Sequence, residues 1–137
     1  MTPQTTEFIE PSGWARPRGY SNGVLAPAGA RMLFVAGQVG WKSDQTLVSP
    51  DFVPQFGQAL SNILEVVETA GGKPSDICNL TIFVADKAVY EEHVRDVGAV
   101  YREVLGKHFP AMALIEVTDF LAEGALVEIQ AIAAVSS

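Results

Sequence analysis

Two glutamates stand in otherwise apolar stretches near the C-terminus of this sequence. Glu116 lies in AMALIEV (111–117), and Glu128 lies in ALVEIQAIAAV (125–135). Burying an unpaired carboxylate is costly, so a glutamate in such a stretch needs a partner or a chemical task. Holding a water molecule as a general base is one such task. For Glu116 the favoured interpretation is a solvated or salt-bridged strand residue.

Glycine, tyrosine and tryptophan gather at the ends of the expected strands. Three segments share this composition: GWARPRGYSNGV (13–24), AGQVGW (36–41) and FPAMALIEV (109–117). Glycines there would let the backbone approach a ligand and present its N–H groups. Taken alone, the residues favour a plainer interpretation, in which glycines make turns and tryptophans fill an interface. That interpretation concerns Gly19, Gly23, Gly37, Gly40, Trp14 and Trp41.

The other reactive side chains form no recognisable motif. His93 and His108 lie apart in the sequence, which predicts no metal site and favours structural histidines with satisfied hydrogen bonds. Cys78 stands inside an apolar run and has no visible base, so we expect a core residue and not a nucleophile. The sequence contains no GxGxxG after a strand, phosphate loop, HExxH or CxxC, and it therefore gives no support to a cofactor.

Composition restricts the class of protein. The 137 residues, 48% hydrophobic and 18% charged, predict one globular domain over 1–137. A net charge of −7 without a stripe of Lys and Arg disfavours nucleic acids and anionic membranes as partners. One cysteine and an N-terminus without signal-peptide features predict a cytoplasmic location. No apolar run approaches the roughly 20 residues that span a bilayer.

Alternating runs in the first part of the chain predict the strands that carry several of these residues. The runs cover 5–10, 21–27 and 31–39, and we expect a meander in which PAGA (27–30) is a short hairpin turn. A nearly continuous apolar run at 77–85 predicts a central strand buried on both faces. The C-terminal segments 111–117 and 125–135 predict two more strands.

Three- and four-residue spacing of apolar residues predicts two helices. The first runs from about Asp51, its expected N-cap, to Ala70, with Pro54 in the first turn and Gly71 and Gly72 at its end. The second begins after Asp86 as N-cap and ends at Gly106. Its expected buried face comprises Val89, Tyr90, His93, Val94, Val97, Tyr101 and Leu105.

The order βββ-α-β-α-ββ predicts an α+β fold in which strands from both halves join one mixed sheet. Each helix has a single apolar stripe, so both should cover the same face. The other face would remain partly apolar, which predicts a homo-oligomer.

Six segments in this order resemble the reactive-intermediate deaminase family (RidA/YjgF, endoribonuclease L-PSP-like). They are GYSNGV, LFVAGQVGW, QALSNILEVVETAGGKPSDI, NLTIFVAD, FPA and LVEIQAIA. The resemblance covers nearly the whole chain and implies a chorismate-mutase-like subunit, assembled as a homotrimer with ligand clefts between neighbouring subunits. It also implies hydrolysis of enamine and imine intermediates to carbonyl compounds and ammonia, without a cofactor.

The sequence departs from the family pattern where a carboxylate would be bound. The arginine that follows the family's Pro-Ala pair and binds the substrate carboxylate is Met112 here. Ala36 replaces a serine, and Leu114 replaces a frequent cysteine. Because a thioether cannot supply the bidentate fork of a guanidinium, the chain resembles divergent subfamilies that lack the arginine.

The resemblance also assigns roles by position. Glu128 falls on the glutamate that positions the attacking water, Gly37 falls where a backbone N–H faces the ligand, and Tyr20 falls on the cleft tyrosine. We expect an apolar cleft for an aromatic or larger, less acidic ligand. One wall would hold Met112, Leu114 and Phe109, and the others Tyr20, Trp14 or Trp41.

An arginine from elsewhere in the chain is a candidate to restore anion binding. Arg18, beside Gly19 and Tyr20, is the first candidate and Arg16 the second. The alternative is that both arginines are simply exposed beside Pro17.

Two functions remain open from the sequence. The first is an enamine or imine deaminase with a non-standard substrate, such as an aromatic one. The second is a trimer that binds a metabolite or acts as a regulatory or chaperone-like partner without turnover. The endoribonuclease activity attributed to some relatives fits poorly with an acidic chain.

Overall fold

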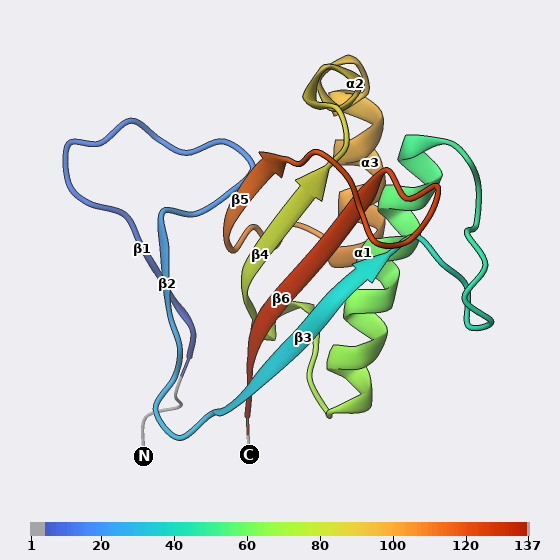
Figure 1. Cartoon of the computed structure of the whole chain (residues 1–137). Coiled ribbons are helices and arrows are strands. Elements are labelled where there is room, and N and C mark those ends of the chain that lie inside the picture. The colour runs from blue at the N-terminus through green and yellow to red at the C-terminus, as the bar shows by residue number, and fades with distance from the viewer. Residues whose placement is uncertain (1–4, 137) are drawn as a thin grey trace.

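The computed structural model describes residues 5–136. The elements are β1 (Glu7–Ile9), β2 (Gly23–Leu25), β3 (Arg31–Val39), α1 (Phe52–Thr69), a 3-10 turn η1 (Pro74–Asp76), β4 (Ile77–Val84), α2 (Lys87–Glu92), α3 (Val94–Leu105), β5 (Ala111–Glu116) and β6 (Val127–Val135). This is the expected α+β order, and Figure 1 shows it from the N-terminus to the C-terminus. No helix within 5–136 has the length and apolar character needed to cross a membrane.

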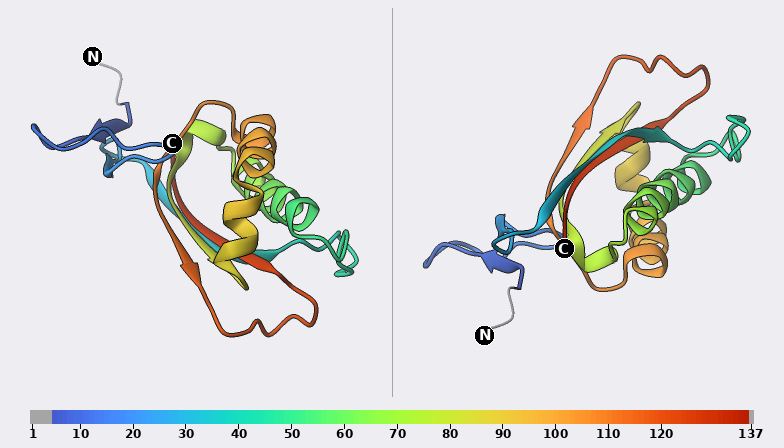
Figure 2. Two further views of the ribbon diagram at one scale, coloured as in Figure 1. Left: turned by 90° about the horizontal axis from the view of Figure 1, so that it is seen from above. Right: turned by 90° about the horizontal axis from the view of Figure 1, so that it is seen from below.

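Four strands form the main sheet, in the order β3-β6-β4-β5. Strand β6 pairs antiparallel with β3 and β4, whereas β4 and β5 run parallel. Helices α1 and α3 pack on one face of this curved sheet, as both views in Figure 2 show. The sheet is therefore mixed, with both long helices on the same face, as the sequence predicted.

The expected β-meander is wrong. Strands β1 and β2 pair only with each other, in a separate two-stranded sheet that projects from the main body (Figure 1). The 27–30 segment does turn, with Ala30 N–H donating to the Pro27 carbonyl at 3.4 Å. It leads, however, from one sheet into the other. Strand β3 pairs instead along the apolar β6, which buries more surface than a three-residue β2 can offer.

The core lies between the main sheet and the two long helices. Helix α1 contributes Phe56, Leu60, Ile63 and Val67, each no more than 1% exposed. Strand β4 is interior, but its residues alternate between buried and half-buried, so the expected burial on both faces is not found in the single chain. The reason is geometric: no helix covers the second face in the described chain.

The expected second helix is two helices. His93 has φ −109° and ψ 18° and separates α2 from α3. Only Val97, Tyr101 and Leu105 of the expected face are buried, because they lie on α3, over the sheet. Val94 is 50% exposed. Gly106 ends α3 with a φ of 67°.

The two expected N-caps have different outcomes. Asp86 caps α2, since its carboxylate accepts from the Ala88 N–H at 2.9 Å. Asp51 stands at the N-cap position of α1 but its side chain makes no capping hydrogen bond, which corrects that expectation. Instead the Asp51 N–H donates to Ser49 Oγ at 3.0 Å. Gly71, with φ 90°, follows the C-cap Ala70.

Candidate functional site

Glu128 lies against the backbone of Gly37, on the neighbouring strand. A Cβ added to Gly37 would overlap Oε2 of Glu128 and stand 2.9 Å from its Cδ. Gly37 falls within an irregular stretch of β3, because the register with β6 shifts between Val35 and Gln38. Bulges of this kind redirect the backbone next to functional sites. Glycine at position 37 leaves the space that the carboxylate occupies, and a larger residue there would displace the carboxylate.

The carboxylate of Glu128 belongs to the sheet face that the helices leave open. Val127 and Ile129, its neighbours on β6, are both fully buried in the core, so alternation directs Glu128 the other way. Its partners across the sheet are Val39 and Phe83. The half-buried Glu128 therefore stands beside apolar residues on this face.

Gln55 fixes the chain that leads into Glu128. This fully buried side chain on α1 donates through Nε2 to the carbonyls of Ser49 (2.9 Å) and Gly124 (3.1 Å). Its Oε1 accepts from the Leu126 N–H at 2.8 Å. The entry to β6 is thus tied to the start of α1, two residues before Glu128.

A cavity of about 380 Å³ opens on the helix side of the sheet, between β5 and α3. Phe109 and Met112 line it together with Val97, Tyr101 and Ile82 of the core. Met112 pairs with Leu80 and packs against the core, so it belongs to the covered face. The cavity volume falls in the ordinary range for a small-molecule site.

Two aromatic rings form one wall of this cavity. Tyr101 and Phe109 stack with centroids 5.3 Å apart and planes inclined by 7°. The Tyr101 hydroxyl donates to the His108 carbonyl at 2.6 Å, which leaves the ring to face the cavity. Burial raises the pKa of Tyr101 above its ordinary range, so this hydroxyl keeps its proton at neutral pH.

The segment before β2 reaches the same cavity. Ser21 donates from its N–H to the Pro110 carbonyl at 3.1 Å and from Oγ to the Phe109 carbonyl at 2.5 Å. These bonds anchor the long β1–β2 connection to the start of β5. Arg18 is thereby held at the cavity, which it lines.

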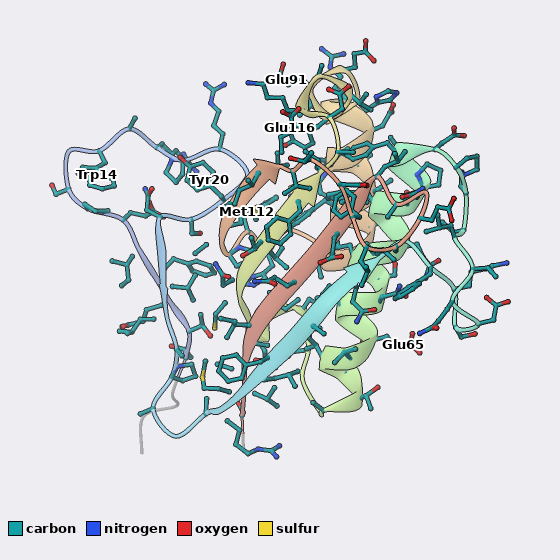
Figure 3. The ribbon with its side chains drawn as sticks, viewed as in Figure 1. Trp14, Tyr20, Glu65, Glu91, Met112 and Glu116 are labelled. Atoms are coloured by element: carbon teal, nitrogen blue, oxygen red, sulfur yellow. The ribbon has the colours of Figure 1, made fainter. Side chains whose placement is uncertain are left out.

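The other predicted site residues lie elsewhere. Tyr20, 41% exposed, is next to the anchored Ser21 and near Met112, but among described residues it is not part of the cavity lining (Figure 3). Leu114 packs against the core beside Ile82. Trp41 follows β3 at the opposite edge of the sheet, where its carbonyl accepts from Asn62 Nδ2 at 2.9 Å. Trp14 is 65% exposed on the projecting loop.

Three plainer interpretations agree with the contacts. Oε1 of Glu116 accepts from the Lys87 N–H at 3.0 Å, so this carboxylate supports the start of α2. His108 is buried with Nε2 2.7 Å from the Ile77 carbonyl. Cys78 is buried, and desolvation raises the pKa of its thiol. A protonated core thiol is a poor nucleophile.

A family model described as "Endoribonuclease L-PSP" matches residues 15–135. The chain belongs to this family. The human 2-iminobutanoate/2-iminopropanoate deaminase is 30% identical over 115 residues, covering 83% of this chain and 78% of that protein. The Escherichia coli K12 protein of the same name is 33% identical over 105 residues. This alignment covers 74% of this chain and 78% of that protein.

Solved structures of Rid and YjgF proteins share the fold. The Yersinia pestis Rid-family protein YyfB superposes with a TM-score of 0.84 at 27% identity, covering 96% of this chain and 99% of that one. Membership in the RidA/YjgF family and its α+β fold is therefore confirmed. Relatives about 30% identical to this family member are imine deaminases, which supports deaminase-type chemistry at the level of the family.

The structure adds two residues that the sequence did not single out in this Rid-family chain. Gly98 and Arg102, both on α3, line the cavity with Met112. Their spacing of four residues places them on one helix face, which was the available signal. The sequence by itself points only to Arg16 and Arg18 as replacements for the missing arginine, because they stand near Tyr20.

Proposed function

We propose that this protein hydrolyses the C=N bond of a reactive 2-imino acid or its enamine tautomer, giving a 2-oxo acid and ammonia. The observation that carries the proposal is the Glu128 carboxylate seated against Gly37 among apolar neighbours. Support also comes from the relatives named imine deaminases.

The proposed reaction needs only water and a base. Glu128 takes a proton from water while the water oxygen bonds to the imine carbon and the C=N π electrons move to nitrogen. Glu128 returns this proton to nitrogen, which gives the neutral carbinolamine. Glu128 then takes the hydroxyl proton and passes it to nitrogen as the C=O bond forms and the C–N bond breaks, so that nitrogen leaves as ammonia and the carboxylate is regenerated. A positioned general base contributes about 10²- to 10⁴-fold to such a step.

We further propose that the complete site forms between copies of this chain. Glu128 and the Met112 cavity belong to opposite sheet faces, so one small ligand contacts both only if a second subunit supplies one of them. The open face carries apolar side chains, with Phe34 73%, Met32 49% and Ile115 45% exposed. Packing against another copy would remove this apolar surface from water, which favours the homotrimer that the family resemblance implies.

The test is the initial rate of imine hydrolysis by the purified protein. Amino-acid oxidases generate a panel of imines in situ, from small aliphatic to aromatic. Glu128→Gln should lower the rate about 10²-fold or more, because the base is lost while size and shape are kept. The matched control is Glu116→Gln, which removes a carboxylate from strand β5 and supplies an amide oxygen that can still accept from the Lys87 N–H.

Absence of rate enhancement on every imine would overturn the deaminase proposal. The binding-only trimer would then be the function to pursue, since ligand binding does not require Glu128 to act as a base. The ribonuclease in the family description has less support, because a net charge of −7 opposes binding of a polyanion.

A further inference from the structure

Both charged side chains that line the Met112 cavity are arginines. Arg18 comes from the anchored loop and Arg102 from α3, and the remaining lining residues of this cavity are uncharged. The aromatic pair Tyr101–Phe109 and Met112 make its interior apolar. An apolar cavity with convergent cationic groups fits a ligand that has an apolar body and one anionic group.

The guanidinium of Arg102 lies close to Gly98. The two residues are four apart on α3, and helix side chains lean toward the N-terminus, so Arg102 reaches back over Gly98. A Cβ added to Gly98 would stand 3.3 Å from Nη1 of Arg102. The guanidinium therefore lies close over Gly98, and a Cβ at this position would require it to shift by a few tenths of an ångström.

We propose that Arg102, supported by Arg18, binds the substrate carboxylate in place of the arginine that Met112 replaces. In this arrangement the arginine that binds the carboxylate comes from α3 instead of β5. Met112 on β5 forms part of the apolar cavity wall instead. The substrate class is then a 2-imino acid with an aromatic or large branched side chain. The carboxylate would contact the two arginines, and the side chain would lie on Tyr101, Phe109 and Met112.

This substrate assignment rests on the proposed function, but carboxylate binding does not, so binding is measured separately from turnover. The probes are 3-phenylpropanoate, its neutral amide 3-phenylpropanamide, and butanoate, titrated by calorimetry or NMR into the intact protein. We expect 3-phenylpropanoate to bind more tightly than either other probe, because only it offers both an anion and an aromatic ring.

Arg102→Ala should weaken 3-phenylpropanoate binding about 10-fold or more and leave the amide unchanged. Arg95→Ala is the matched control, since it removes the same charge from an exposed position of α3 outside the cavity lining. It should change the affinity less than about 2-fold, because Arg95, unlike the similarly exposed Arg102, does not line the cavity and its charge is screened from the ligand by solvent. Gly98→Ala, with Arg102 still present, should reduce the affinity for 3-phenylpropanoate less than Arg102→Ala does, because the guanidinium has to shift by only a few tenths of an ångström.

Three results would overturn the inference: equal affinity of the wild type for the acid and the amide, no binding of the acid at all, or an unchanged acid affinity in Arg102→Ala. Failure of the proposed function has a different signature. Imine hydrolysis would then be absent while arginine-dependent binding of 3-phenylpropanoate persisted.

Discussion

Met112 and Glu128 project from opposite faces of one four-stranded sheet. Met112 pairs with the core residue Leu80 and lines the cavity beside α3, whereas Glu128 pairs with Phe83 on the open face. Strand β4 separates their two strands. The two predicted halves of the site therefore do not meet within one chain, and the proposed site needs a second copy of the chain to bring them together.

Subunit mixing tests this arrangement. Glu128→Gln and Arg102→Ala each disable one half of the proposed site, so each variant alone should hydrolyse the aromatic imine poorly. Co-refolding an equal mixture should restore about a quarter of the wild-type activity, because random assembly of a ring gives that share of interfaces two intact halves. Activity of the mixture no higher than the mean of the two variants would contradict a site formed between subunits.

Gly37→Ala should abolish hydrolysis without unfolding the protein. The added Cβ overlaps the Glu128 carboxylate, which would have to leave its position beside the backbone. The measurement is the imine hydrolysis rate together with the thermal midpoint. Gly23→Ala is the control, because its added Cβ would meet Ile9 Cβ at an ordinary 3.4 Å. Wild-type rates in Gly37→Ala would show that Glu128 does not act from this position.

Met112→Arg should shift the substrate preference toward small imines. A guanidinium on β5 would bind a carboxylate bidentately and fill part of the cavity that we assign to a bulky side chain. We expect kcat/KM to rise about 10-fold on the imine of 2-aminobutanoate and to fall on aromatic imines. Met112→Lys adds the same charge without the fork and should give a smaller gain. Equal changes in kcat/KM for both substitutions would show that the added charge, and not the bidentate geometry, causes the gain.

Alkaline pH should destabilise the fold. Burial raises the pKa of the Cys78 thiol above its ordinary 9.0 and the pKa of the Tyr101 hydroxyl above its ordinary 10.0. Both groups hold their protons more tightly in the folded than in the unfolded chain. Their contribution to stability is therefore complete below the unfolded pKa values and is lost as the pH rises toward the folded ones.

Urea unfolding at a series of pH values measures this effect. The free energy of unfolding should decline from about pH 9 upward. Cys78→Ala and Tyr101→Phe should each remove part of the decline, and Tyr101→Phe should also cost about 1 kcal/mol at neutral pH by losing the hydrogen bond to His108. If the free energy of unfolding declines equally in both variants and the wild type, other groups cause the loss of stability at alkaline pH.

Local patterns in the sequence predicted most elements closely. Strand β3 spans the predicted 31–39, and α1 lies within one residue of the predicted ends. Hydrophobic alternation and helical spacing report which side chains share a face, and that information is contained in neighbouring residues. The resemblance to the Rid family likewise rests on contiguous segments, and the family model confirmed it.

Tertiary structure decided what depends on pairing between distant segments. The local sequence pattern does not reveal that β3 pairs with β6 and not with β2, because strand pairing depends on the total area buried in the sheet. The break at His93 was likewise not predicted, since a continuous apolar spacing runs through it.

The candidate site shows the same division. The sequence marked Glu128, Gly37 and Met112 as positions of interest, and these assignments remain predictions. Only the strand register places Glu128 against Gly37 and on the face opposite Met112. Only the packing of α3 over β5 brings Arg102 to the cavity that Met112 lines. Residue types are fixed locally, whereas the distances between functional groups are set by how strands and helices far apart in the chain pack together.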